Sequence, residues 1–312
     1  MRIALIGYGE VGRILAEDLG AAGHRVQAHD LKLAGAGASA APLRAHAAAH
    51  GVVLSDTQAD AVRGAELVVS AVTASQAVAV AEACAAGLAP GAFFLDFNSA
   101  SPGAKIQASQ WVNAAGGRYV EGAVMTSVPP YRLKVPLLLG GPDAAALKPL
   151  LDTLGFAAKV HSEQLGVASA TKMCRSVMIK GLEAMVIESF TAARHHGVED
   201  AVIASLQETF PGIDWEKQAS YFFQRVIEHG RRRSEEVREV AVTVREAGLV
   251  PHSAAGTAER QAHIADLADA GVFGTRGEPG FARSADWRVE ADRILTAAGA
   301  DRLLAAVNKD KT

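Results

Sequence analysis

The sequence predicts an α/β domain with a mostly parallel sheet, followed by an all-helical domain. Short runs rich in β-branched residues alternate with helical patterns over the first half of the chain, and the strand patterns stop near residue 162. Strands that alternate with helices are typical of βαβ units, whose parallel sheets are covered on both faces. We therefore place the first domain at residues 1–162 and the helical domain at residues 163–312.

The elements of the first domain follow from this alternation. Strands are predicted over residues 2–6, 25–29, 66–72, 92–96, 119–124, 135–139 and 157–161. Helices are predicted over residues 10–22, 75–87, 102–115 and 143–154. Gly23-His24 and Pro90-Gly91 supply turn residues between helix and strand. The Ala- and Gly-rich stretch 33–51 is interpreted as containing a mobile surface loop at Gly35-Ala36-Gly37-Ala38.

The second domain has helical periodicity only. Apolar residues, Val167, Ala170 and Met173 among them, recur at helical spacing over residues 164–196. Further helices are predicted over residues 200–210, 214–229, 234–247, 258–268 and 285–307.

Composition excludes several classes of function. The chain has 31 basic and 34 acidic residues, and this balance gives no electrostatic reason to expect nucleic acid or a membrane surface as a partner. No apolar stretch approaches the ~20 residues that a membrane-spanning helix needs, and the first apolar run is too short for a signal peptide. Cys84 and Cys174 are interpreted as buried thiols of a reducing compartment. We therefore expect a cytoplasmic protein.

Two further patterns concern metals and nucleophiles. His195-His196 has no additional ligand at metal-binding spacing, and the chain contains no H-E-x-x-H motif. It also contains no G-x-S-x-G motif and no Walker loop. The expectation from these patterns is that no metal is bound.

A glycine motif lies directly after the first predicted strand, where a helix begins. It reads Gly7-Tyr8-Gly9-Glu10-Val11-Gly12. In a G-x-G-x-x-G motif the first glycine permits the tight turn, the second lets a pyrophosphate approach the backbone, and the third lets helix and strand pack closely. The helix N-terminus supplies N–H groups to the phosphates. These six residues therefore predict a Rossmann domain that binds a dinucleotide.

The end of the second predicted strand indicates which dinucleotide. Asp30 stands there, followed by Leu31 and Lys32 without an arginine. A carboxylate at this place accepts hydrogen bonds from the adenine ribose and repels a 2′-phosphate, which favours NAD over NADP. Val72 and Thr73 end the third long strand pattern, so they are candidates for the nicotinamide side; an ordinary strand end is the alternative.

Three polar segments follow in an order that resembles a known family. They are residues 96–102, residues 121–127, and residues 166–172 together with Ser176. With the glycine motif, they resemble the β-hydroxyacid dehydrogenase family, which includes 6-phosphogluconate and 3-hydroxyisobutyrate dehydrogenases. The resemblance covers essentially the whole chain and is strong up to about residue 185. It is closest to a branch with a divergent helical C-terminal domain.

The first two segments imply a substrate site. The family pattern of an acidic residue, a polar pair and Ser-Pro matches at Asp96, Ser99, Ser101 and Pro102. The family then has Ser-Gly-Gly, which holds a substrate carboxylate, where this chain has Met125, Thr126 and Ser127. This chain lacks the two glycines but keeps hydroxyl donors, so the resemblance implies that it binds the substrate carboxylate differently. Asn98, next to Ser99, is a further candidate for substrate binding.

The third segment implies the catalytic residue. Lys172 matches the characteristic lysine of the family, and Ser176 replaces the asparagine that follows it. The resemblance implies that Lys172 exchanges the hydroxyl proton as general acid and base. A closed, partly apolar cleft would lower its pKa by desolvation. We expect Lys180, farther along the helix, to extend its ammonium group to solvent.

A basic cluster at His229-Gly230-Arg231-Arg232-Arg233 gives a weaker signal. Arg232 or Arg233 could clamp a substrate carboxylate bidentately, but a solvated helix end with i,i+4 charge pairs is the alternative. The family has a Lys-Asp pair in this region, and the nearest positional match here is Glu235-Glu236, which is a departure.

Together these patterns predict reversible hydride transfer between NAD and a β-hydroxy acid or related alcohol, in a cleft between the domains. The substrate would be a small molecule bearing a carboxylate, and the resemblance implies a homodimer. One alternative is a non-catalytic NAD(H)-binding sensor or scaffold. Others are an imine reductase, against which Lys172 argues, and a keto-acid reductase.

Overall fold

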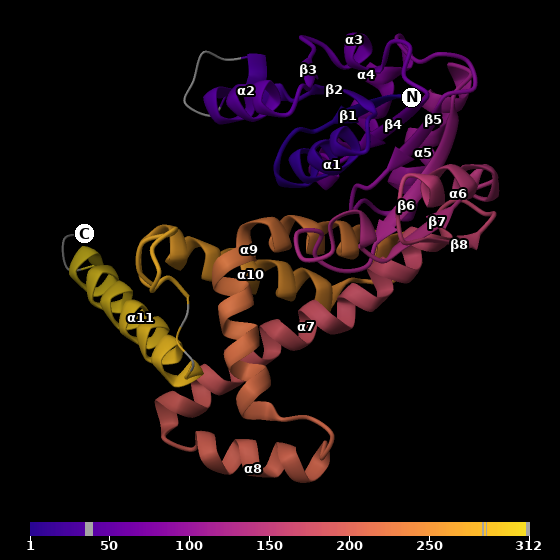
Figure 1. The fold of residues 1–312 in the computed structure, drawn as a ribbon. Helices are drawn as coiled ribbons and strands as arrows, with labels where there is room; N and C mark the ends of the chain where they lie inside the picture. Colours follow the sequence, from indigo (N-terminus) through magenta and orange to yellow (C-terminus); the bar gives the residue numbers. More distant parts are fainter. Residues whose placement is uncertain (35–39, 283, 285, 310–312) are drawn as a thin grey trace. The chain divides into compact units, whose positions relative to one another are not determined.

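The computed structural model describes residues 1–34, 40–282, 284 and 286–309. The segment Gly35-Ala36-Gly37-Ala38, predicted as a mobile loop, lies outside them. The chain divides into two compact units (Figure 1). The first comprises Met1–Cys174 with Val242–Leu249, and the second comprises Arg175–Ala241 with Val250–Thr312.

The first unit is built on one sheet of eight strands in the order β3-β2-β1-β4-β5-β6-β7-β8. The strands are β1 (Arg2–Ile6), β2 (Arg25–His29), β3 (Val53–Leu54), β4 (Leu67–Ser70), β5 (Phe93–Asp96), β6 (Arg118–Val124), β7 (Leu137–Gly140) and β8 (Ala158–Ser162). Every neighbouring pair is parallel except β6 with β7. The strand order reverses between β1 and β4, which is where ligands bind in open α/β sheets.

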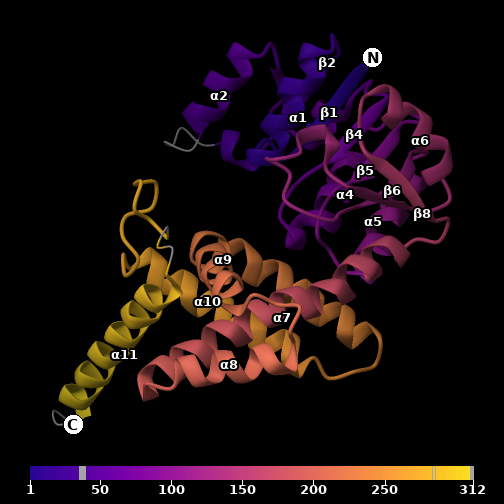
Figure 2. The same cartoon turned by 60° about the horizontal axis from the view of Figure 1, so that its bottom comes forward.

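Both faces of this sheet are buried. Leu5, Val69 and Leu95 belong to one hydrophobic cluster, whereas their chain neighbours Ile6, Val68 and Phe94 belong to another. Because successive side chains of a strand point to opposite faces, these two clusters form the two cores of the unit. Helices cover them (Figures 1 and 2): α1 (Glu10–Ala21), α2 (Ala40–Ala49), α3 (Gln58–Val62), α4 (Ala77–Ala85), α5 (Pro102–Ala114) and α6 (Ala144–Thr153). The predicted α/β fold with a mostly parallel sheet is confirmed.

Some local predictions for this unit need correction. The Ala- and Gly-rich stretch 33–51, in which no helix was predicted, contains helix α2, because alanine is the strongest helix former and Leu43 and Ala47 give the helix a buried face. The short elements β3 and α3 had no clear pattern. Strand β4 ends at Ser70, so Val72 and Thr73 lie beyond it.

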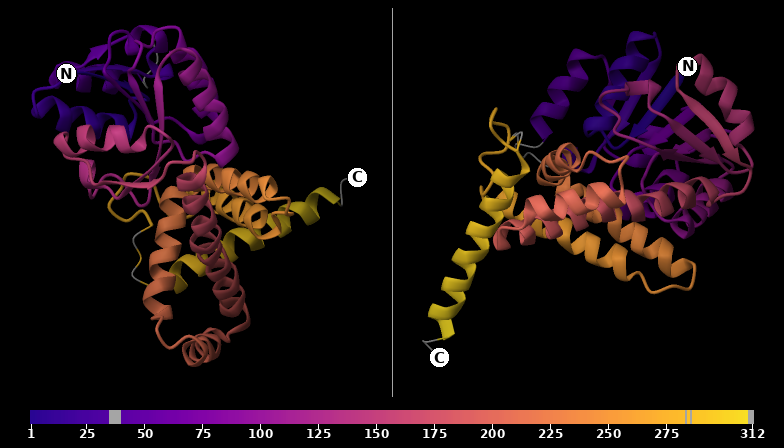
Figure 3. Two further views of the ribbon diagram at one scale, coloured as in Figure 1. Left: turned by 90° about the vertical axis from the view of Figure 1, so that its right-hand side faces the viewer. Right: turned by 90° about the horizontal axis from the view of Figure 1, so that it is seen from below.

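The second unit is helical, as predicted. Helix α7 (Val167–His196) enters it from the first unit, followed by α8 (Glu199–Thr209), α9 (Trp215–Glu246), α10 (His252–Asp269) and α11 (Trp287–Lys309). Phe190, Trp215, Phe223, Ile264 and Trp287 are buried together in its core. The parts of α7, α9 and α10 in this unit lie side by side (Figures 2 and 3).

Helix α9 corrects the prediction of two separate helices over residues 214–229 and 234–247. Gly230 lies inside it, and a Cβ at this position would come within 2.8 Å of the Gln261 carbonyl oxygen of α10. The glycine therefore permits close packing between α9 and α10 and does not end the helix.

The cysteines differ from each other. Cys84 is buried, and burial raises the pKa of its thiol to about 12. Cys174 is exposed, so the prediction of two buried thiols is wrong for this residue. Among the described residues, no helix has the length and apolar character needed to cross a lipid bilayer.

Candidate active site

The glycine loop between β1 and α1 has the backbone geometry that its motif requires. Gly7 has φ +96°, and a Cβ there would collide with the Ala71 carbonyl group after β4. A Cβ on Gly12 would collide with the Gly7 carbonyl oxygen. A Cβ on Gly9 would meet no atom of the described residues within 4 Å. Gly7 and Gly12 are thus needed for packing, whereas Gly9 leaves the backbone open to a ligand.

The start of helix α1 faces this opening. Gly9 is the N-cap and provides no side-chain cap for the first-turn N–H groups of Glu10, Val11 and Gly12. Tyr8, also predicted as a cofactor contact, is fully buried. Uncapped N–H groups and the helix dipole favour a bound phosphate at this place.

Asp30 lies beside the same loop, after β2. Its Oδ2 accepts the Tyr8 N–H at 2.9 Å, and its Oδ1 accepts the Lys32 N–H at 2.9 Å. A carboxylate offers about four acceptor positions, so capacity for ribose hydroxyls remains. Asp30 therefore stabilises the glycine loop, a role that its position in the sequence does not reveal.

Asn98 connects the ends of β4 and β5. Its Oδ1 accepts the Val72 N–H at 2.7 Å, and its Nδ2 donates to Ser70 Oγ at 2.9 Å. The side chain is buried. One polar atom is thus engaged with the end of β4 and the other with the residue two positions beyond it, which indicates that Asn98 positions Val72. Thr73, the next residue, is exposed at the start of the short 3-10 helix η2 (Ala74–Gln76).

A buried ion pair fixes the end of β5 itself. Lys105 Nζ lies 2.9 Å from Asp96 Oδ1, and Tyr119 Oη donates to Asp96 Oδ2 at 2.6 Å. Burial, aided by the Asp96 carboxylate, raises the pKa of Tyr119 well above its ordinary value. The phenol therefore stays protonated and keeps donating to the carboxylate. Asp96, which the resemblance singled out, is enclosed in this network.

Lys172 meets the loop after β5. Its Nζ donates to Ser99 Oγ at 2.6 Å, and the lysine is half-buried near the start of α7. Both residues belong to the first unit. Because β1, β4 and β5 are adjacent and parallel, the Lys172–Ser99 contact lies at the same edge of the sheet as the glycine loop.

Glu121, in the middle of β6, holds the helix that carries Lys172. Its Oε1 accepts the Ala168 N–H at 3.0 Å, and its Oε2 accepts Ser169 Oγ at 2.8 Å and the Ser169 N–H at 3.4 Å. A carboxylate at a helix N-terminus is stabilised by its N–H groups and dipole. Gly140 on β7 leaves the space that this side chain occupies. Sequence reasoning assigned no role to Glu121; the available signal is a glutamate within an apolar strand.

A second carboxylate performs a similar task for α5. Glu246, at the end of α9 and within the first unit, accepts Ser101 Oγ at 2.7 Å and the Gly103 N–H at 3.1 Å. Ser101 is itself the N-cap of α5 and accepts the Ala104 N–H. These contacts fix the chain that follows Ser99, and sequence reasoning missed them.

The remaining substrate candidates fall into two groups. Met125, Thr126 and Ser127 follow β6, which is parallel to β5 and ends at the same edge of the sheet. Ser176 and Arg232 belong to the second unit. Arg232 is exposed and lies 3.6 Å from Glu236 in an i,i+4 pair, which is the alternative to a substrate clamp.

Lys180 is not extended to solvent, contrary to the prediction. It is buried, and its Nζ lies 2.6 Å from Glu236 Oε2. Burial is the main cause that lowers the pKa of Lys180, and Glu236 opposes it. The ion pair gives this lysine a partner inside the second unit.

The fold and the glycine loop define the first unit as an NAD(P)-binding Rossmann domain. A family model described as the NAD binding domain of 6-phosphogluconate dehydrogenase matches residues 2–162. A second model, described as a domain of unknown function (DUF1932), matches residues 193–264. The chain belongs to the β-hydroxyacid dehydrogenase family, in the branch with a divergent helical C-terminal domain.

Solved structures agree with this placement. A conserved hypothetical protein from Sinorhizobium meliloti is 38% identical, with a TM-score of 0.73 over 94% of this chain and 96% of that one. The conserved protein MTH1747, described as structurally similar to 3-hydroxyacid dehydrogenases, is 28% identical, with a TM-score of 0.66 over 86% and 99%. The 3-hydroxyisobutyrate dehydrogenase of Mycobacterium tuberculosis, solved with L-serine, is 17% identical, with a TM-score of 0.66 over 94% and 98%, and shows the fold alone.

Proposed function

We propose that the protein is an NAD-dependent dehydrogenase that oxidises a β-hydroxy acid or a related alcohol, with Lys172 as general acid and base. The observation that carries this proposal is the 2.6 Å contact between Lys172 Nζ and Ser99 Oγ at the edge of the sheet where the glycine loop lies. It places an amine and a hydroxyl group together where parallel α/β sheets bind their ligands.

The residues divide the chemistry between them. Bound NAD would supply the acceptor for the hydride that leaves the carbinol carbon. Lys172, in its neutral form, takes the hydroxyl proton at Nζ, and in the reverse reaction its ammonium group returns that proton to the carbonyl oxygen. Ser99 holds the amine with its Oγ lone pair and retains its own O–H for the substrate oxygen. Thr126 and Ser127 offer hydroxyl donors for a substrate carboxylate.

The glycine loop would hold the cofactor. The uncapped N–H groups at the start of α1 suit the pyrophosphate, and the absence of a side chain at Gly9 suits its close approach. Asp30 supports NAD, since its carboxylate would repel a ribose 2′-phosphate. Asp30→Ala is expected to narrow the preference for NADH over NADPH in calorimetric titrations, and an unchanged preference would assign cofactor choice to other residues.

The proposal is tested by substrate profiling with a lysine variant. The purified protein is assayed against a panel of hydroxy acids with NAD and with NADP, and against keto acids and imines with NADH and with NADPH, followed at the absorbance of the reduced cofactor. Lys172→Met should lower kcat by about 10²–10⁴-fold, the usual range for general acid–base catalysis, without changing NADH binding. Lys148→Met is the matched control, because Lys148 pairs with Asp152 on the exposed surface of α6.

Two outcomes would contradict the proposal. Turnover by Lys172→Met within a few-fold of the parent would remove Lys172 from catalysis. NADH binding without turnover of any hydroxy acid, imine or keto acid would favour the sensor or scaffold instead. Turnover of keto acids or imines alone, in the reductive direction, would support the reductase alternatives.

A further inference from the structure

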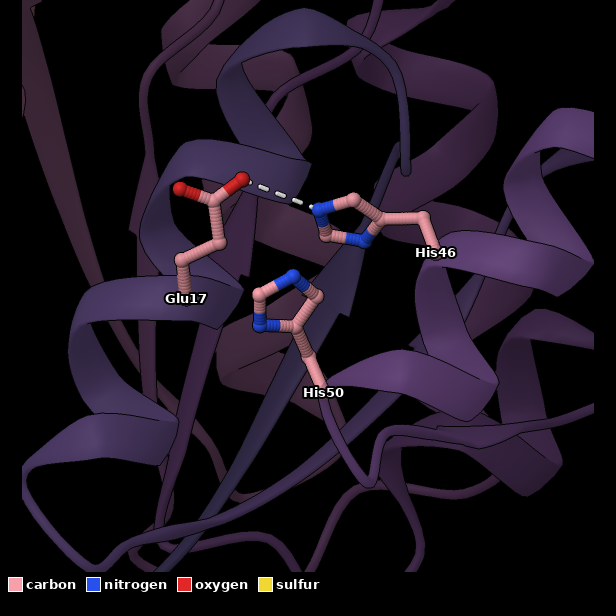
Figure 4. A group of neighbouring side chains, drawn as sticks. All are labelled: Glu17, His46 and His50. Atoms are coloured by element: carbon pink, nitrogen blue, oxygen red, sulfur yellow. Dashed lines mark hydrogen bonds and ion pairs between the residues drawn. The ribbon is translucent and has the colours of Figure 1, made fainter.

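A second cluster of polar side chains lies on the first unit, between helix α1 and the end of helix α2 (Figure 4). It consists of Glu17, His46 and His50, and one potential ligand atom from each lies within 4.8 Å of the others. His46 Nε2 is 3.0 Å from Glu17 Oε1. The His50 ring is stacked on the His46 ring with centroids 4.4 Å apart. The cluster has no part in the proposed dehydrogenase chemistry.

The local structure brings the two histidines together. His46 lies on α2, and the His50 N–H donates to the His46 carbonyl oxygen at 3.1 Å, so the helical path continues one residue beyond Ala49. Residues four apart on a helix share a face. Glu17 on α1 faces the same point, and its side chain reaches toward both rings (Figure 4).

Tyr8 fixes the orientation of the His46 ring. Its Oη lies 2.8 Å from His46 Nδ1, on the side of the ring opposite Glu17. Tyr8 is fully buried, and burial raises its pKa to about 12, so the phenol is neutral. A histidine that binds metal through one nitrogen commonly uses the other nitrogen for such a hydrogen bond, which sets its tautomer and orientation.

The Glu17 carboxylate presents one oxygen to the histidines and uses the other elsewhere. Arg132 Nη2 donates to Glu17 Oε2 at 2.7 Å, whereas Oε1 faces His46. Arg132 is also bound by Asp18 at 2.9 Å, so two carboxylates surround one guanidinium group. A negative charge therefore remains to attract a cation.

We propose that Glu17, His46 and His50 bind one divalent transition-metal ion of the Zn²⁺ type, with solvent in the remaining position. Two imidazole nitrogens and one carboxylate oxygen form a common donor set for zinc. Tetrahedral ligation with bonds of about 2.0–2.1 Å places neighbouring donor atoms about 3.3 Å apart. The His46–Glu17 pair is already at 3.0 Å. Binding requires that His46 Nε2 release its proton to solvent, with Nδ1–H then donating to Tyr8 Oη, and that the exposed His50 ring rotate.

This inference differs from the expectation that no metal is bound. That expectation rested on local motifs, and the carboxylate of this cluster comes from a different helix. The spacing His46-x-x-x-His50 was the available signal in the sequence. The ion would link the end of α2 to α1, next to Tyr8 of the glycine loop.

The test is direct titration of the chelator-treated full-length protein with ZnCl₂, by calorimetry and by competition with a zinc-sensitive dye. We expect one ion per chain. His50→Ala should weaken binding at least ~10-fold, because even the loss of a partner behind a ligand costs about 10–100-fold in affinity. Tyr8→Phe, which removes the hydrogen bond to His46 Nδ1, should fall in that range.

Controls separate a site from adventitious binding. His252→Ala is the matched control, since His252 is an exposed histidine in the second unit. His50 is exposed and joins the cluster only by ring stacking and its backbone, so its alanine variant should keep the parent circular dichroism. X-ray absorption of the zinc-loaded parent should show imidazole and carboxylate ligation. Equal zinc affinity for the parent and His50→Ala, or loss of binding in His252→Ala alone, would overturn the proposal.

Discussion

Replacing Glu121 with glutamine should lower the free energy of unfolding and shift the helix that positions Lys172. The carboxylate accepts three hydrogen bonds from Ala168 and Ser169 at the start of α7, and the residue is fully buried. Glutamine keeps one acceptor oxygen and turns an amide N–H₂ group toward groups that also donate. The variant therefore leaves at least one buried donor without an acceptor and removes the charge at the helix N-terminus.

The magnitude follows from these contacts. A hydrogen bond to a charged group contributes about 1.5–3 kcal/mol, and one unsatisfied buried donor costs about 1–3 kcal/mol. Removing a buried charge recovers part of its desolvation cost, so the two effects do not add in full. We expect Glu121→Gln to lower the free energy of unfolding by about 3 kcal/mol.

The assay combines urea unfolding with kinetics. Glu66→Gln is the control, because the exposed Glu66 carboxylate accepts a hydrogen bond from the Arg2 N–H, and the loss of that bond should change stability by less than about 0.5 kcal/mol. If Glu121 positions Lys172, kcat should fall while the Kd for NADH stays unchanged. Equal stability of the two variants would refute the energetic reasoning, and an unstable Glu121→Gln protein with parental kcat would refute the positioning role.

Two further predictions concern the glycine loop and a buried carboxylate. Gly12→Ala should lower the melting temperature of the cofactor-free protein, since overpacking costs about 1–3 kcal/mol, whereas Gly9→Ala should leave that temperature unchanged and weaken NADH binding. The reverse pattern in calorimetry would contradict the assigned roles. Burial raises the pKa of Glu290, although Arg293 opposes this shift. The folded state therefore binds the Glu290 carboxyl proton more tightly than the unfolded state does. As a result, the free energy of unfolding falls as the pH rises from 4.5 through the folded-state pKa. Glu290→Gln should therefore melt at a higher temperature than the parent at pH 7, with the gain disappearing toward pH 4.5; a gain independent of pH would show another cause.

The fold was predictable because its signals are local. Alternating strand and helix patterns fix the parallel sheet, and the glycine motif fixes its first turn. The misplaced elements have equally local explanations. Alanine-rich α2 has little amphipathic contrast. A glycine such as Gly230 usually indicates the end of a helix, but here it permits close packing of α9 against α10. A single sequence does not distinguish a glycine that ends a helix from one that admits a neighbour.

The residues that position the site through long-range hydrogen bonds were not predictable in the same way. Glu121 on its strand lies 47 and 48 residues from its helix partners Ala168 and Ser169, and Glu246 lies 145 residues from Ser101. No periodic pattern connects such residues. Their charges were visible in the sequence, but their partners became apparent only when the sheet edge and the helix ends were placed.

The polar residues at this sheet edge serve two tasks, and their hydrogen bonds distinguish them. Asp96 and Asn98 are buried with their polar atoms engaged by the protein, so they hold the strand ends in place. Lys172 and Ser99 are only half-buried, which leaves them accessible to a substrate. Breaking a buried ion pair by removing one partner costs about 3–5 kcal/mol, so changing Asp96 would destabilise the fold whether or not Asp96 touches substrate. Loss of activity on changing Asp96 would therefore not identify a catalytic residue, whereas loss at Lys172 with an intact fold would.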